Sequence, residues 1–255
     1  MSINKPLILV SNDDGFDAVG ICSLVEMIGD MGEIIVCAPD SARSGFSRAF
    51  SATVPLRLTR RHNMGEVEVW STNGTPVDCV KLALDQMLGR QPDLIVGGIN
   101  HGNNATINIH YSGTVGIAIE GTLHGIPSIA YSLDNQSADA DFAPLTSYIR
   151  RITSLVLEKG LPFGSCLNVN FPSAQAFAGT RICRMAYSSW IDEYTLCNHP
   201  HGEHYYWLGG ECVNDEPDES DTDSWALERD FIAITPIKVD ATDFELKDML
   251  DHWDL

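Results

Sequence analysis

The chain has 255 residues, of which 44% are hydrophobic, enough for one large α/β domain with a substantial core. Its 35 acidic and 16 basic residues give a formal net charge of −19, which repels the backbone of DNA and RNA. We therefore expect no nucleic-acid polymer as a partner.

The seven cysteines are scattered and free of C-x-x-C spacing, which argues against a disulfide framework or a zinc knuckle. Small buried thiols in a reducing compartment are the expectation. The sequence also has no run of about 20 apolar residues that could cross a membrane. We therefore expect a cytoplasmic protein that does not bind membranes.

Short apolar runs alternate with segments of helical period through the first two thirds of the chain. This pattern predicts an α/β fold with a mainly parallel, Rossmann-like sheet flanked by helices. Thr75 and Asp78 form a capping box around Pro76, which marks a helix start. In chain order the expected elements are a strand at 7–10, a helix at 21–31, a strand at 34–38, half-exposed strands at 49–57 and 66–70, the helix from Pro76, a strand at 94–96, a helix at 114–124, a strand at 128–131, a helix at 145–158, and strands at 166–171 and 182–185.

The composition changes from Ser188 to about Glu228, where aromatic residues and histidines precede an acidic run at 211–223. Such a segment cannot easily build its own core, so it is either an exposed loop or an arm that packs on another subunit. A strand at 231–235 and a short helix at 244–250 follow it.

Four polar, glycine-rich segments follow the predicted strands or open a predicted helix. In open α/β sheets ligands bind beyond the carboxyl ends of the strands, so these segments are the candidate site. They are SNDDG at 11–15, APDSARSG at 38–45, GGINHGNNA at 97–105 and YSGTVG at 111–116.

Asp13 and Asp14 are adjacent carboxylates that repel each other unless one is protonated or a cation lies between them. Together with the Ser44 hydroxyl and the Asn100 amide they supply only hard oxygen ligands, which suit Mg²⁺ or Mn²⁺ better than zinc. The simpler alternative is an Asx-turn before Gly15. Four matching segments favour the cation site.

Ser112, Gly113 and Thr114 open a predicted helix directly after a polar loop. Hydroxyls and free N–H groups at a helix N-terminus can bind phosphate, although a plain serine N-cap is the alternative. Neither G-x-G-x-x-G nor a P-loop is present, which disfavours dinucleotide binding and P-loop chemistry.

The motifs ILVSNDDG, APDSARSG, NGTPVDCV, GGINHGNN and YSGTVGIAIEG, in this order, resemble the SurE (survival protein E) family of metal-dependent nucleotidases. The resemblance runs from Leu7 to Thr235. It implies a phosphatase that hydrolyses nucleoside 5′- or 3′-monophosphates with one divalent cation per subunit, Mg²⁺ or Mn²⁺. The metal ligands it implies are Asp13, Asp14, Ser44 and Asn100.

The same resemblance assigns Asn104 to the catalytic site with Asp13 and Asp14, where it would orient the phosphate with Ser112, Gly113 and Thr114. It also implies a homodimer or homotetramer built by an exchanged arm. The expected organisation is a single domain with a core at about 1–187, an oligomerisation arm at about 188–228, and a C-terminal strand and helix at about 229–255. The chain departs from the family in its site loop, where Thr106 replaces a common glycine and His101 and Asn103 add polar groups.

We expect water to attack the phosphorus in line while the metal polarises a phosphoryl oxygen. Attack by Asp13 or Asp14 to form an aspartyl-phosphate is the alternative. A rival function is a non-catalytic nucleotide or metal sensor that acts through its oligomer. A glycosyltransferase or deacetylase would need a D-x-D motif or a His-rich site near the strand ends, and neither is evident.

Several further residues have two interpretations. His199, His201 and His204 could bind a transition metal but more simply belong to the arm. The acidic run at 211–223 lacks the glycine and terminal glutamate of an EF-hand loop, so a solvated face is expected rather than a calcium site. Tyr111 could stack on a nucleobase or pack at the helix entrance, and Arg43 and Arg48 are candidates for contacting substrate anions.

Overall fold

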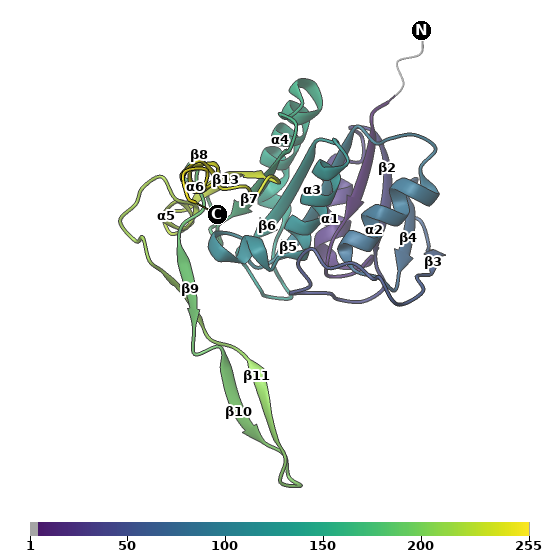
Figure 1. Ribbon diagram of the computed structural model, residues 1–255. Coiled ribbons are helices and arrows are strands. Elements are labelled where there is room, and N and C mark those ends of the chain that lie inside the picture. Colours follow the sequence, from purple (N-terminus) through teal and green to yellow (C-terminus); the bar gives the residue numbers. More distant parts are fainter. Residues whose placement is uncertain (1–4, 255) are drawn as a thin grey trace.

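A nine-stranded sheet forms the centre of the computed structural model, which describes residues 5–254 (Figure 1). The strands follow the order β3-β4-β2-β1-β5-β6-β7-β13-β8, and the six from β4 to β7 are parallel. Their bounds are β1 Leu7–Ser11, β2 Glu33–Pro39, β3 Leu58–Arg60, β4 Glu68–Thr72, β5 Leu94–His101, β6 Ser128–Leu133, β7 Ser165–Phe171, β8 Gly179–Ile182 and β13 Phe231–Lys238.

Helices cover both faces of this sheet because its strands are apolar on both sides. On one face α1 (Val19–Ile28) and α4 (Thr146–Lys159) pack against residues such as Ile8 and Val169. On the other face α2 (Pro76–Leu82) and α3 (Gly113–Leu123) pack against Leu9 and Ile95. The predicted α/β fold with a mainly parallel sheet is confirmed.

The chain reverses direction across the sheet at β1. It first adds β2 and β4 on one side of β1 and then returns to place β5 on the other side. At this position α1 lies so close to β5 that a β-carbon on Gly20 would be 2.0 Å from the Ile99 carbonyl oxygen. The gap beyond the ends of β1 and β5 is the place where ligands bind in such sheets.

The Thr75 capping box is present and α2 begins at Pro76 as predicted, continuing into a π-helical turn at Ala83–Met87. The expected strand at 49–57 is wrong. Its backbone is bonded to side chains rather than to a neighbouring strand, because Ser51 N donates to Asp78 and Arg57 N donates to Asn73. The antiparallel partner of β4 is instead β3.

Other boundaries differ from the sequence-based expectation. Strand β5 runs to His101, so Asn100 lies inside the strand, where the register shifts between Gly97 and Asn100. Helix α1 begins two residues earlier and ends three residues earlier than predicted, and β8 ends at Ile182, where a strand was predicted to begin.

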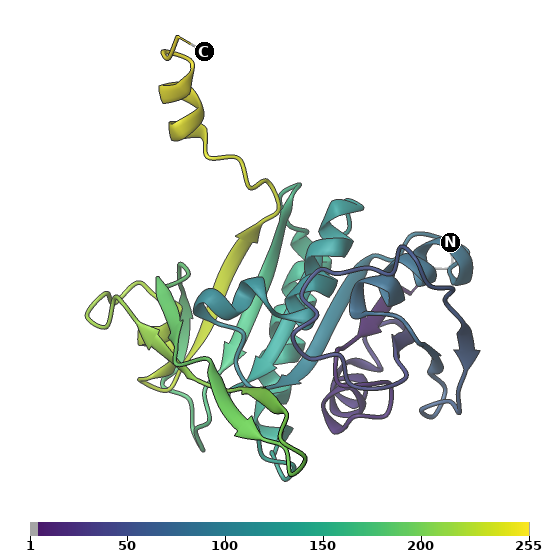
Figure 2. The same ribbon diagram turned by 60° about the horizontal axis from the view of Figure 1, so that its bottom comes forward.

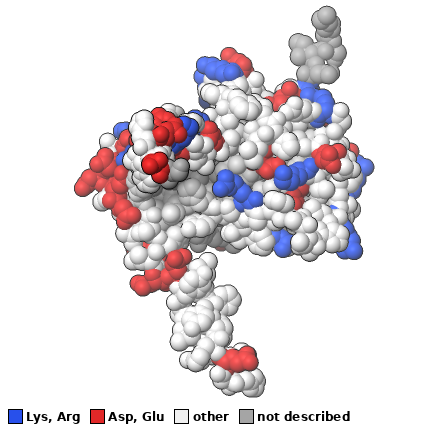
Figure 3. All heavy atoms as spheres, viewed as in Figure 1, with Lys and Arg blue, Asp and Glu red and all other residues white. Residues whose placement is uncertain are grey.

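The segment after β8 forms an arm that extends away from the sheet (Figure 1). Two antiparallel ribbons build it: β9 (Ser188–Ile191) pairs with β12 (Glu211–Asn214), and β10 (Tyr194–Asn198) pairs with β11 (His204–Leu208). Most of its surface is uncharged in Figure 3.

The last part of the expected arm segment instead belongs to the body of the protein. Helix α5 (Asp223–Leu227) buries Ala226 and Leu227 against Ala233 of β13. The short helix α6 (Phe244–Leu250) has the predicted bounds and stands away from the body (Figure 2). Between residues 5 and 254 we find no helix with the length and apolar character needed to span a membrane.

Candidate active site

Asp13 lies directly beyond β1 and is buried against the start of α3. Its carboxylate accepts a hydrogen bond from the Thr114 hydroxyl, and its carbonyl oxygen accepts one from Arg43 N at 2.7 Å. The helix approaches so closely that a β-carbon on Gly113 would be 2.9 Å from the Asp13 Cβ. Burial raises the pKa of Asp13 to about 7, with Thr114 opposing the shift and Asp14 adding to it.

Asp14 is partly buried beside Asp13 and lies close enough to His101, the last residue of β5, to feel its charge. Its Oδ2 atom is buried and has no hydrogen-bond partner among residues 5–254. Burial raises the pKa of Asp14, while the nearby His101 lowers it. The two carboxylates therefore meet a desolvation cost that protein groups only partly offset, and a divalent cation would offset it further.

Asn100 is brought to the same place by β5, which pairs with β1. Its Nδ2 donates to the carbonyl oxygens of His101 at 3.1 Å and Gly102 at 2.7 Å. These bonds use the amide nitrogen, so the Oδ1 atom is the group left to bind a ligand. Asn100 thus has the chemistry expected of a cation ligand.

Ser44 lies in an exposed loop and is less closely tied to the site. The loop itself is anchored at the carboxylates, because Arg43 N bonds Asp13 O. No hydrogen bond of the Ser44 hydroxyl is found within residues 5–254. The sequence therefore placed the correct loop beside Asp13, while the role of Ser44 as a ligand stays a prediction.

The start of α3 uses its hydroxyls for its own structure. Ser112 caps the helix, accepting from Val115 N at 3.0 Å, and Thr114 donates to Asp13. Val115 N and Gly116 N are thereby paired with Ser112, and the Gly113 N–H acts on the Asp13 carboxylate, so what the turn offers an anion is mainly the positive end of the helix dipole. Asn104 is buried nearby and held by residues of β6 and β7.

Two secondary candidates are also placed by the structure. Tyr111 is 53% exposed, so its ring is open to a ligand, and its carbonyl accepts from Ser47 N. Arg43 is engaged locally, because its Nη2 donates to Asn73 O at 3.1 Å and lies 3.5 Å from Asp40. Arg48 is exposed.

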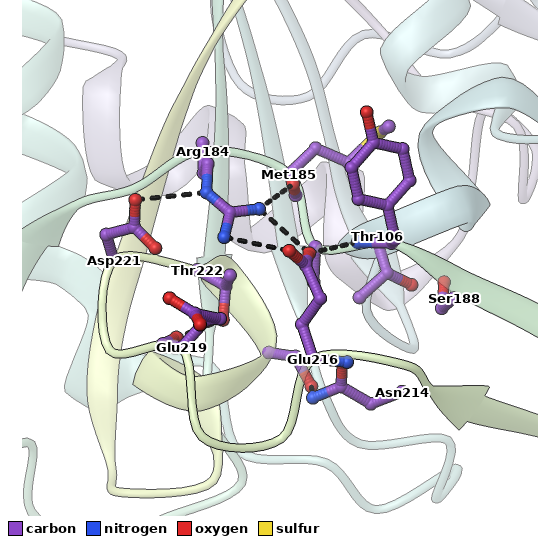
Figure 4. Close-up of polar contacts among 12 residues, drawn as sticks. Thr106, Arg184, Met185, Ser188, Asn214, Glu216, Glu219, Asp221 and Thr222 are labelled. Carbon is purple, nitrogen blue, oxygen red and sulfur yellow. Dashed lines mark hydrogen bonds and ion pairs between the residues drawn. The ribbon is translucent and has the colours of Figure 1, made fainter.

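The acidic run at 211–223 was expected to be a solvated face, but two of its carboxylates form ion pairs with Arg184. Figure 4 shows Arg184 between Glu216 and Asp221, with nitrogen–oxygen distances of 2.8 and 3.0 Å. Glu216 also accepts from Tyr187 N, and the Arg184 guanidinium lowers the pKa of Glu216. These bonds fasten the end of the arm segment to the residues that lead into it.

Asp223, at the end of the same run, joins the site loop to the body. It is fully buried and accepts from Thr106 N at 2.9 Å and from Ala186 N at 3.0 Å. Burial raises its pKa, and these N–H groups oppose the shift. The acidic composition of the run concealed this residue from sequence reasoning.

The histidines of the arm do not gather into a metal site. His204 Nδ1 lies 2.8 Å from Asn198 Oδ1, and the His199 ring accepts from His201 N. Over the described part of the chain, no group of three or more His, Cys, Asp or Glu side chains could hold a metal ion.

Comparisons with known proteins agree on one family. The model of the family described as "Survival protein SurE" matches residues 8–192. The chain is 50% identical to the 5′-nucleotidase SurE of Phocaeicola vulgatus, over 100% of this chain and 99% of that protein, and 48% identical to that of Bacteroides fragilis, over 100% of both. The crystal structure of the SurE protein from Aquifex aeolicus superposes with a TM-score of 0.83 at 32% identity, covering 97% of this chain and 99% of that one.

Thr106 provides a test of the backbone of the site loop, because its φ of 55° lies in the left-handed region that penalises a β-carbon. We expect Thr106→Gly to be more stable to denaturant than Thr106→Ala by about 1 kcal/mol. The matched pair at exposed Glu26 in α1 should show the opposite order, with alanine more stable by about 1 kcal/mol. The same order at both positions would contradict the assigned conformation.

Proposed function

The chain belongs to the SurE family, and on this premise we propose that it is a 5′-nucleotidase that hydrolyses nucleoside monophosphates to nucleoside and phosphate. The observation that carries the proposal is the position of Asp13 and Asp14 at the point where the strand order reverses. The seven cysteines of the chain are all free thiols, which favours action in a reducing compartment such as the cytoplasm.

A single divalent cation, Mg²⁺ or Mn²⁺, would be held by Asp13, Asp14, Asn100 and Ser44. Asp14 Oδ2 has no hydrogen-bond partner in the described part of the chain, and the Asn100 amide nitrogen is occupied while its Oδ1 faces no donor there; both support this set, because hard cations prefer such oxygen ligands. When bound, the cation would neutralise charge on the phosphoryl group.

The residues of the chain then orient the substrate. The start of α3 would present the positive end of its dipole to the phosphate, and the buried Asn104 amide would supply a donor. Thr114 holds the Asp13 carboxylate in one orientation, so Asp13 is less free to attack phosphorus. Water is accordingly the proposed nucleophile, and the leaving alkoxide takes a proton from solvent.

The activity can be tested with purified protein, Mn²⁺ or Mg²⁺, a panel of 5′- and 3′-nucleoside monophosphates, and an aryl phosphate. We expect phosphate release, and a loss of at least about 100-fold in kcat/KM for Asp14→Asn, because one electrostatic contact contributes this much in comparable sites. Asp17→Asn, an exposed neighbour with the same charge change, should keep the activity. No phosphate release by the unaltered protein would favour the sensor function, and a full rate for Asp14→Asn would overturn the site.

The cation can be tested separately through stability. Burial raises the pKa of Asp13 in the folded protein to about 7. In the absence of divalent cations, the protonated Asp13 therefore stabilises the folded state fully below about pH 4, and this stabilisation is lost as the pH rises through 7. Asp13→Asn should lack this loss, and Mn²⁺ at pH 8 should stabilise the unaltered protein more than the variant. Thermal unfolding with and without chelator measures both, and parallel pH profiles of the two proteins would contradict the prediction.

The arm, whose two ribbons span residues 188–214, is proposed to assemble a homodimer or homotetramer. In the β10–β11 ribbon, Tyr194 pairs with Leu208 and Leu196 with Tyr206, so four large side chains share one face, and each is at least 53% exposed. A two-stranded ribbon with no layer on either face is marginal in water, which favours a partner.

Substituting Leu196 and Leu208 together by serine should therefore reduce the mass measured by sedimentation or light scattering to that of a smaller species. The circular dichroism of the sheet and helices should remain, because the ribbon lies outside the body. Thr195→Ser, on the other face of the ribbon, is the control. A monomeric unaltered protein at micromolar concentration would contradict the assignment.

A further inference from the structure

Three buried polar side chains from two core strands converge on Asn104. Asn170 Oδ1 accepts from Asn104 N at 2.7 Å, and Asn168 Nδ2 donates to Asn104 O at 2.8 Å. Ser132 Oγ accepts from Asn104 Nδ2, also at 2.8 Å. The backbone of Asn104 is thus fixed on both sides of the residue, and its side chain is fixed as well.

The position of this cluster follows from strand register. Asn168 and Asn170 lie two residues apart on β7, so they project from the same face. Ser132 on β6 is the direct partner of Asn170, and on its other side it is the partner of Asn100 on β5. The row of side chains that holds Asn104 therefore ends at a proposed ligand of the cation.

These side chains are costly in a core. Asn168, Asn170 and Ser132 each have 0% exposure, and the neighbouring Thr235 has 2%. Asn168 Oδ1, Asn170 Nδ2 and Thr235 Oγ1 have no hydrogen-bond partner among the described residues. A half-paired amide in a core lowers stability, and an apolar side chain in its place would avoid the cost. Local cost of this kind is typical of groups kept for function.

We propose that Ser132, Asn168 and Asn170 are positioning residues for the phosphatase reaction, which act only through Asn104. Ser132 takes one of the two hydrogens on Asn104 Nδ2 and leaves the second to bind a phosphoryl oxygen. A donor held in place before the substrate binds stabilises developing charge without reorganisation. This inference rests on the proposed function, and it adds residues of β6 and β7 to the site.

A double-mutant cycle between Ser132 and Asn104 tests the proposal. Ser132→Ala should lower kcat about tenfold and change KM by less than about threefold, because a slightly displaced donor mainly weakens the transition state. Asn104→Ala should lower kcat by about 100-fold. In the Asn104→Ala background, Ser132→Ala should have no further effect, since the group it positions is absent.

The matched control is Ser128→Ala, which makes the same substitution on the same strand and face. Ser128 is also fully buried, but its hydroxyl donates to Ile126 O, far from the site loop. It should leave kcat and KM unchanged. Thermal unfolding of all variants shows that each is folded at the assay temperature.

A second measurement does not depend on activity. Asn170→Ala removes the acceptor of the Asn104 N–H, so hydrogen exchange at 102–108 should accelerate at least tenfold while exchange in β1 and β5 stays unchanged. Unchanged exchange in the loop would overturn the positioning role, and so would a full rate for Ser132→Ala or an equal loss in both backgrounds. If the unaltered protein released no phosphate, the proposed function would fail instead, and the exchange result would still report whether the loop is held.

Discussion

Two adjacent carboxylates, Asp13 and Asp14, lie buried or partly buried just beyond the end of a parallel strand, where they repel each other and lose contact with water. The groups around them determine how this unfavourable energy is offset. Asp13 is 3% exposed, and Asp14 keeps one oxygen buried without a partner among the described residues. Within residues 5–254, Thr114 is the one residue whose hydroxyl donates to the Asp13 carboxylate. Two charges in this environment are unfavourable unless one carboxylate is protonated or an opposite charge joins them, which supports the proposed cation site.

The burial of these carboxylates depends on two helices that pack very close to the ends of the strands. Glycine at position 20 allows α1 to lie against Ile99, and glycine at position 113 allows α3 to lie against Asp13. Larger residues would force each helix away from the strand ends. Two glycines far apart in the sequence thus bring a helix N-terminus, a pair of carboxylates and an asparagine amide to one place.

The site loop between β5 and α3 is held from two directions. On the sheet side, asparagines of β7 bond the backbone of Asn104. On the other side, Asp223 of α5 bonds Thr106 N, and Ser188 at the base of the arm bonds Ile107 N. The loop is therefore hydrogen-bonded both to the sheet and, through Ile107 N, to Ser188 at the start of the arm. Its polar sequence is compatible with a fixed shape because its neighbours supply the partners.

The sequence by itself determined the fold class, the capping box of α2 and the segments that meet at the strand ends. These depend on local pattern: buried runs of parallel-strand length, a Thr-Pro-x-Asp cap, and polar residues directly after strands. Motif order also identified the family. The expectation that the segments carrying Asp13 and Asn100 lie side by side needed only the rule that parallel strands end at one edge, and β1 does pair with β5.

Only the tertiary structure determined the features that depend on contacts between residues far apart in the sequence. Residues 49–57 have the composition of a strand, yet side chains at 73 and 78 take their backbone bonds. Asp223 is one acid in an acidic run, and only burial against Thr106 and Ala186 gives it a specific role. In the sequence, Asn168 and Asn170 are two polar residues within an otherwise apolar strand. Only the fold shows that both bond the backbone of Asn104. A hydrogen-bond partner more than 60 residues away leaves no local pattern, because side-chain type specifies what a group can bind but not which group will be near it.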